Sequence, residues 1–251
     1  MADLYDAVVG QERAVRHLKA AARSPVHAYL FVGATGTGIR EAASAFAADL
    51  LCEDGGCTTC SVCTRVMAGR HPDVVVVERT GASILVEEID EVLRVAVRPP
   101  AEGKRKVIVL VDVHLIDQQY PRLLKTLEEP PASTVFVVLA EDLPVELATI
   151  ASRCVRVDFA ALSEEAIVEG LVREGEDRDR AEEIARASAG RMDRARLLAG
   201  DAGFAARQAL WKGVPSRLDG MGATVATLTD ELIASVETVL DPLRERQAAE
   251  A

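Results

Sequence analysis

The chain has 251 residues with a formal net charge of −11 at pH 7, and 49% of its residues are apolar while only 4% are aromatic. This length allows one large domain or two ordinary ones. The acidic balance argues against a wide surface that grips a phosphate backbone, and the low aromatic content argues against a stacking platform for single-stranded nucleic acid. No basic segment followed by an apolar one opens the sequence, and no run of about 18 apolar residues occurs. We therefore expect a cytoplasmic protein without a membrane partner.

Short apolar runs alternate with helical patterns over residues 1–160, which is typical of strand–helix units around a parallel sheet. The expected strands are the runs 28–32, 73–78, 107–112, 134–139 and 154–158. The expected helices between them cover 39–51, 86–97 and 119–129, and two prolines stop the last of these. The sequence therefore predicts an α/β domain over 1–160.

The remaining residues have no strand-like run and are helical in pattern. Ser163 is placed to cap the first of these helices, and a second helix is expected over 180–189. A further helical block runs from Phe204 to the C-terminus. We expect a small helical lid domain over 161–201 and a short helical C-terminal segment over 202–251.

A glycine loop joins the first strand to the first of these helices, with glycines at Gly33, Gly36 and Gly38. In the pattern G-x-x-x-x-G-K-[ST], backbone N–H groups cradle phosphates, the lysine reaches the outer phosphates and the hydroxyl holds Mg²⁺. Here Ile39 stands at the lysine position and Arg40 at the hydroxyl position. An ordinary glycine-rich turn is the alternative. Because the loop follows a buried strand and opens a helix, we interpret it as a phosphate loop by descent that does not bind ATP.

Asp112 ends the third strand, at the position where a Walker B aspartate orients Mg²⁺. In hydrolysing relatives the next residue is a glutamate that activates water, but here it is Val113. A buried strand that happens to end in aspartate is the alternative. Together with the glycine loop, Asp112 predicts a vestigial nucleotide site that has lost its catalytic base.

Four cysteines lie close together in the sequence, with two C-x-x-C steps and a preceding gap that contains two glycines. Four thiolates can surround Zn²⁺ tetrahedrally, and such closed sites are structural because no position is left for water. Free thiols and redox chemistry are the alternatives. With no export signal to favour disulfides, we expect a structural zinc ion held by Cys52, Cys57, Cys60 and Cys63.

Ser152, Arg153 and Cys154 follow the fourth strand after a short helical link. An arginine on such a connection can reach across an interface to the γ-phosphate of a neighbouring subunit. A lone arginine is more often a surface salt-bridge partner, and from these residues alone both interpretations stay open. Cys154 is expected to be a small buried apolar residue.

These features occur in one order, and the set resembles the clamp-loader subunits of bacterial DNA polymerase III, a branch of the AAA+ ATPases. The Leu-Glu-Glu-Pro-Pro block and the Ser-Arg-Cys tripeptide are the most specific parts of the resemblance, which spans about residues 5–200. Besides the glycine loop and the cysteines, the segments that carry it are Val9–Glu12, His27–Phe31, His71–Asp73, Leu124–Pro131 and Ser152–Cys154.

The resemblance implies an AAA+ P-loop parallel sheet with an inserted zinc knuckle, followed by the helical lid. In this family an intact loop marks the gamma/tau motor subunits, whereas a broken loop with a retained Ser-Arg-Cys marks the delta prime branch, which this chain resembles. The implied role is non-hydrolysing: the chain is not an ATPase by itself, and Arg153 is a finger donated in trans to a neighbour's ATP. The implied partners are the gamma/tau and delta subunits in a hetero-pentamer that places the sliding clamp on primed DNA.

The segment Gly190–Ala195 looks like the family's second-domain sensor motif, with Arg194 as the sensor arginine. The family normally carries a third, helical collar domain. Residues 202–251 are fewer than that domain usually has, so we expect an abbreviated or incomplete collar. Two other functions stay open: an active ATP-binding motor subunit like gamma/tau, and a zinc-containing nucleic-acid adaptor unrelated to ATP.

Overall fold

The computed structural model describes residues 3–81, 83–116 and 120–250. The chain divides into two compact units, Met1–Arg196 and Leu197–Ala251, and each is described by itself. None of the described helices combines the length and the apolar character that a membrane span needs.

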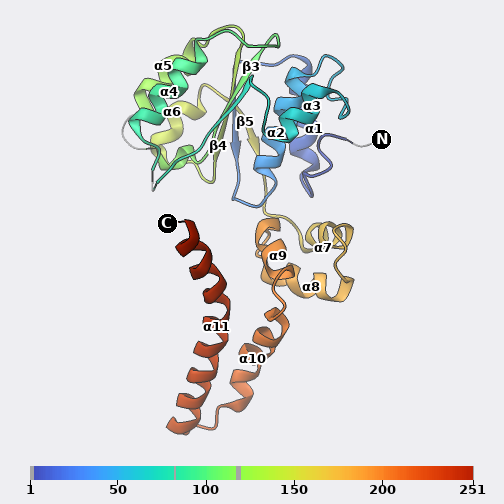
Figure 1. The fold of residues 1–251 in the computed structure, drawn as a ribbon, viewed down its shortest axis with the longest axis vertical. Coiled ribbons are helices and arrows are strands. Elements are labelled where there is room, and N and C mark those ends of the chain that lie inside the picture. The colour runs from blue at the N-terminus through green and yellow to red at the C-terminus, as the bar shows by residue number, and fades with distance from the viewer. Residues whose placement is uncertain (1–2, 82, 117–119, 251) are drawn as a thin grey trace. The chain divides into compact units, whose positions relative to one another are not determined.

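A parallel sheet of five strands forms the centre of the first unit (Figure 1). The strand order is β2-β3-β4-β1-β5, and every neighbouring pair is parallel. All five predicted strands are present, with bounds that differ from the predictions by at most two residues. They are β1 (Ala28–Val32), β2 (Val74–Val77), β3 (Lys106–Leu110), β4 (Thr134–Ala140) and β5 (Val155–Asp158).

Helices cover both faces of the sheet, so alternate residues of each central strand enter two different cores. Tyr29 and Phe31 of β1 pack in one core, and Ala28 and Leu30 pack in the other. The first core is shared with α1 (Glu12–Arg23), α2 (Ile39–Leu51) and α3 (Ser61–Met67). The second is shared with α4 (Val86–Ala96), α5 (Tyr120–Glu128) and α6 (Ala148–Ala151), on the opposite side of the sheet (Figure 1).

Residues 161–196, which we call the lid, belong to the same compact unit as the sheet. They contain α7 (Glu164–Arg173), α8 (Arg178–Ala187) and the first part of α9 (Met192–Ala199). The Ser163 hydroxyl accepts a hydrogen bond from the Ala166 N–H at 3.1 Å, as its predicted capping role requires. Asp177 caps α8 in the same way, which is why that helix begins two residues before the predicted start.

The second unit contains α10 (Phe204–Arg217) and α11 (Gly222–Glu250). The helical pattern expected from Phe204 onward forms these two helices, and Gly220 in the turn between them has a φ of +80°. Arg217 makes a two-pronged ion pair with Glu231, at 2.7 and 2.9 Å, which ties the two helices together.

Candidate nucleotide and metal sites

The glycine loop lies at the carboxyl edge of the sheet, between the ends of β4 and β5. The Gly33 N–H donates to the Ala140 carbonyl at 3.0 Å, and a Cβ added to Gly33 would lie 2.6 Å from the Cβ of Phe159. Gly36 and Gly38 have φ values of +82° and +88°, a region that glycine adopts without steric cost. All three glycines of the loop are therefore required by its backbone geometry.

The side chains of the two residues after the loop are already buried or paired within the chain. Ile39, at the lysine position, is the first residue of α2, and its side chain is buried in the first core. Arg40, at the hydroxyl position, makes an ion pair with Glu78, which follows β2. An intact loop provides a lysine that contacts the phosphates and a hydroxyl oxygen that binds Mg²⁺, and neither Ile39 nor Arg40 provides these groups.

Asp112 lies two residues beyond β3, with a left-handed φ of +58°. Its carboxylate makes an ion pair with Arg79, with the Arg79 Nε 3.3 Å from Asp112 Oδ2. Val113, at the position of the catalytic base, is fully buried. The Arg79 guanidinium is therefore paired with the carboxylate that would orient Mg²⁺ in an active nucleotide site.

Glu141 is a residue of this site that the sequence analysis missed. It follows β4 directly, and its carboxylate accepts hydrogen bonds from the Thr35 hydroxyl and, at 3.0 Å, from the Thr35 backbone N–H. These two bonds, together with the positive surroundings of His114 and Arg191, hold the pKa of the Glu141 carboxyl below its usual range. A carboxylate of the chain therefore already satisfies donors of the loop.

The lid contacts the loop at Gly36. The Met192 N–H donates to the Gly36 carbonyl at 2.8 Å, and a Cβ added to Gly36 would lie only 1.8 Å from Asp193 Oδ1. Arg191 binds the Asp193 carboxylate at 3.2 and 2.8 Å, and this pairing holds the pKa of that carboxyl low. Arg194, which resembled a sensor arginine, has an exposed side chain, whereas Met192 and Asp193 of the same motif contact the loop.

Arg153 lies on the connection from α6 to β5. Its Nε donates to Glu128 Oε1 at 2.6 Å, and its Nη1 donates to the Thr149 carbonyl at 2.8 Å. In the isolated chain Arg153 is thus a partly exposed salt-bridge partner of Glu128. Cys154 packs against the second core, and burial raises the pKa of its thiol to about 12.

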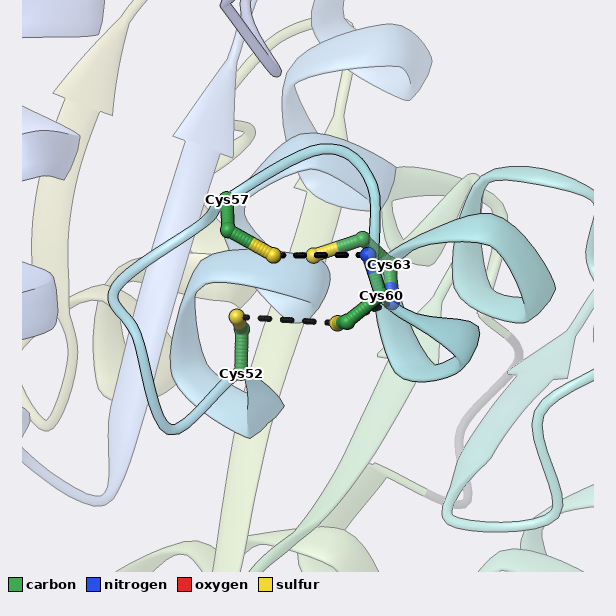
Figure 2. A group of neighbouring side chains, drawn as sticks. All are labelled: Cys52, Cys57, Cys60 and Cys63. Carbon is green, nitrogen blue, oxygen red and sulfur yellow. Dashed lines mark hydrogen bonds between the residues drawn. The ribbon is translucent and has the colours of Figure 1, made fainter.

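The four clustered cysteines come from three places in the chain and point toward one another (Figure 2). Cys52 follows α2, Cys57 lies in the loop, Cys60 caps α3 and Cys63 is in its first turn. All four sulfur atoms lie within 4.8 Å of one another, and the sulfurs of Cys52 and Cys60 are 3.8 Å apart. Sulfurs at about 2.3 Å from a tetrahedral zinc ion are about 3.8 Å from each other. The cluster therefore has the size of a metal site.

The surroundings of the thiols also suit a metal. N–H groups of Cys60 and Thr59 donate to the Cys57 sulfur and lower the pKa of that thiol to about 6. Burial raises the pKa of the Cys63 thiol, so this ligand has to lose its proton when an ion binds. His71 lies outside the cluster of four, with its Nδ1 accepting a hydrogen bond from the Asp73 N–H at 3.1 Å. These four cysteines could hold one metal ion.

A family model described as "DNA polymerase III, delta subunit" matches residues 10–163. The chain belongs to this family. The match covers the sheet, the glycine loop, the cysteine cluster and the Ser-Arg-Cys segment. The resemblance to clamp-loader subunits, including their delta prime branch, is confirmed by this match and by the relatives described next.

Two curated relatives are 34% identical to the chain. One is the DNA polymerase III subunit tau of Bacillus subtilis, matched over 171 residues, or 65% of this chain and 30% of tau. The other is the delta' subunit of the same organism, matched over 150 residues, or 58% of this chain and 46% of delta'. The chain thus spans less than half the length of these relatives. Overall identity does not separate a tau-like from a delta'-like role.

A solved structure of a RuvB mutant from Thermotoga maritima shares the fold, with a TM-score of 0.52 at 15% identity, over 92% of this chain and 70% of that one. The predicted fold class is confirmed: the chain has an AAA+ parallel sheet, followed by helices.

Proposed function

We propose that the chain acts as a non-hydrolysing subunit of the DNA polymerase III clamp loader, of the delta prime type. In this proposal it assembles with gamma/tau and delta subunits into a hetero-pentamer that loads the sliding clamp onto primed DNA. It binds no ATP itself, and it contributes Arg153 to the ATP site of a neighbouring subunit.

The observation that carries the proposal is that the charged groups of the nucleotide site are paired within the chain. Arg40 is held by Glu78, and Asp112 is held by Arg79. A Mg²⁺–nucleotide complex would have to break both pairs and would gain no lysine in return, because Ile39 is buried. This supports a subunit that has kept the fold of an ATPase without its reaction.

The role proposed for Arg153 rests on its chemistry and its position. Its side chain makes an ion pair with Glu128 and hydrogen bonds to Glu128, Thr149 and Ser152, and it remains about 30% exposed. A neighbour's phosphate can compete for the guanidinium because exposed ion pairs are weak, whereas guanidinium–phosphate pairs are strong. Arginine fingers of this kind raise the rate of phosphoryl transfer by about 10³–10⁵-fold.

We also propose that the cysteine cluster holds structural Zn²⁺. All four ligand positions are filled by cysteine, so no site is open for water or substrate. When bound, the ion would supply cross-links between the end of α2, the loop and the start of α3. Its contribution is then to the stability of this part of the fold.

The test of the proposed function is ATP turnover by a loader reconstituted from this chain and the gamma/tau and delta chains of the same genome. Arg153→Ala should keep the assembly intact, measured by size-exclusion chromatography, and abolish turnover at one neighbouring site. Arg94→Ala is the matched control, since Arg94 is an exposed arginine paired with Glu91 on α4. Unchanged turnover in an assembled Arg153→Ala loader would contradict the proposal.

A tau-like motor is the second candidate, and one observation favours it. A cleft of about 630 Å³ lies beside the loop, lined by residues that include Gln11, Gly33 and Phe159. A nucleotide base could enter this cleft even though the phosphate side is occupied. Saturable binding of Mg²⁺–ATP by the purified chain would favour this candidate over the first.

A further inference from the structure

Two carboxylates of the chain lie against the glycine loop, in a place where other phosphate loops hold an anion. Glu141 accepts both the backbone N–H and the hydroxyl of Thr35. Asp193 lies so close to Gly36 that a single added carbon atom would overlap it. Backbone N–H groups in such loops attract negative charge. Glu141 supplies that charge to the Thr35 N–H, and Asp193 adds a second negative charge beside Gly36.

Arg191 connects the two carboxylates. It donates two hydrogen bonds to Asp193, and its charge also acts on Glu141. Glu141 extends from the sheet, whereas Arg191 and Asp193 belong to the lid. The three charges, together with the Met192 N–H to Gly36 carbonyl bond, join the lid to the loop.

The hollow between the loop and the lid is small. The cavity there measures about 10 Å³ and is lined by residues that include Gly36, Gly38 and Met192. One water molecule needs a cavity of about 10–15 Å³, so a phosphate group does not fit unless the lid moves. This hollow is thus too small for a phosphate group, whereas the cleft of about 630 Å³ lies on the Gly33 side of the loop.

We propose that Glu141 and Asp193 are a built-in replacement for nucleotide phosphate, which excludes external polyphosphate from the loop and holds the lid docked on the sheet. The inference rests on the proposed function only in taking the loop to be unused for ATP. A lid held by the chain's own charges keeps one position while neighbouring subunits bind and release nucleotide. Glu141 and Asp193 then keep the lid of this subunit from moving when neighbouring subunits bind or release nucleotide.

The test is hydrogen–deuterium exchange on the full 251-residue chain, comparing the natural protein with Glu141→Gln/Asp193→Asn. These substitutions remove the two charges with little change of shape. Amides of residues 34–38 and 191–195 should exchange at least about fivefold faster in the variant, because local opening becomes easier. In the natural protein, added sodium tripolyphosphate should leave exchange of the loop amides unchanged.

The matched control is Glu182→Gln, which removes an exposed carboxylate from α8 of the same lid and should change neither region. If the double variant does not fold, Arg191→Gln removes the positive charge that acts on both carboxylates and the ion pair with Asp193, and it should accelerate the same amides. Unchanged exchange in the folded variant would overturn the inference, as would slowing of the natural loop amides by tripolyphosphate. Neither result depends on ATP turnover in an assembled loader, so this inference and the role of Arg153 can fail separately.

Discussion

The cysteine cluster and the glycine loop both have the sequence pattern of a ligand site. They differ in whether other side chains of the chain already contact the groups that would bind the ligand. In the cluster, four sulfurs face one another at the spacing of a tetrahedral ion. In the loop, the Thr35 N–H is bound by Glu141, and Asp193 fills the space at Gly36. A motif can therefore keep its backbone geometry while residues far away in the sequence take the place of its ligand. Thr35 and Glu141, for example, are 106 residues apart.

Removing one ligand of the cluster should have the largest effect on stability. Cys60→Ser should reduce bound metal from about one Zn²⁺ per chain to a small fraction of that, and lower the free energy of unfolding by about 4 kcal/mol. Elemental analysis and urea unfolding measure the two quantities. Ser61→Ala, at an exposed position of α3, is the control and should change neither. Full metal content in Cys60→Ser would show that the cluster is not the site.

Adding a methyl group at Gly36 tests whether the lid contacts the glycine loop. Gly36→Ala and Gly220→Ala share the cost of a left-handed backbone, about 1–2 kcal/mol, because their φ values are +82° and +80°. Only at Gly36 does the new carbon overlap the lid, since nothing lies within 4 Å at Gly220. Gly36→Ala should therefore lower the free energy of unfolding by about 1–3 kcal/mol more than Gly220→Ala. Equal losses in thermal unfolding would mean that the lid does not rest on the loop.

Acid should remove the contribution of the two carboxylates. The folded-state pKa values of Glu141 and Asp193 are lowered, so their stabilisation is fully present above their ordinary pKa values of about 4 and is lost as pH falls through the folded values. The charged groups facing them are His114 beside the sheet and Arg191 and Arg196 in the lid.

Unfolding of the natural chain and of Glu141→Gln/Asp193→Asn, followed by circular dichroism, measures this effect. The natural chain should be the more stable at pH 7, and the difference should shrink as pH falls below about 4. If the stability difference between the two proteins grew as pH fell, the ionised carboxylates would be destabilising, contrary to this prediction.

The paired arginines of the nucleotide site should matter least for stability. The Arg40–Glu78 pair is about half exposed at both side chains. Arg40→Met should change the free energy of unfolding by less than about 1 kcal/mol, as is usual for surface ion pairs. The change should match that of Arg94→Met on α4, measured by urea unfolding. A much larger loss would mean that this pair supports the fold rather than merely replacing the groups of a nucleotide site.

Much of the fold could be predicted because buried parallel strands are continuous apolar runs. Residues 28–32 and 39–51 match β1 and α2 at both ends. Helix α1 was not predicted, because only Ala14 and Leu18 are buried in it among many charged residues. Helix α3 was not predicted either, because its short span lies inside the cysteine pattern.

The parts of the candidate site that are contiguous in sequence could be found, namely the glycines and the cysteines. Glu141, Asp193 and Arg79 could not, because their roles depend on which strand lies beside β1 and on where the lid rests. The one available signal was Glu141, an acidic residue directly after an apolar run. Its position beside the glycine loop can be inferred only once β4 is known to pair with β1.

The central claim is that the chain's own charges, and not only the lost lysine, keep nucleotide out of the loop. The most direct test is a fluorescent ATP-analogue titration with Mg²⁺ of three proteins. They are the natural chain, Ile39→Lys/Arg40→Thr, and that variant combined with Glu141→Gln/Asp193→Asn. The account predicts no saturable binding by the first two and measurable binding by the third. Micromolar binding by the natural chain, or full recovery on restoring the loop alone, would contradict it.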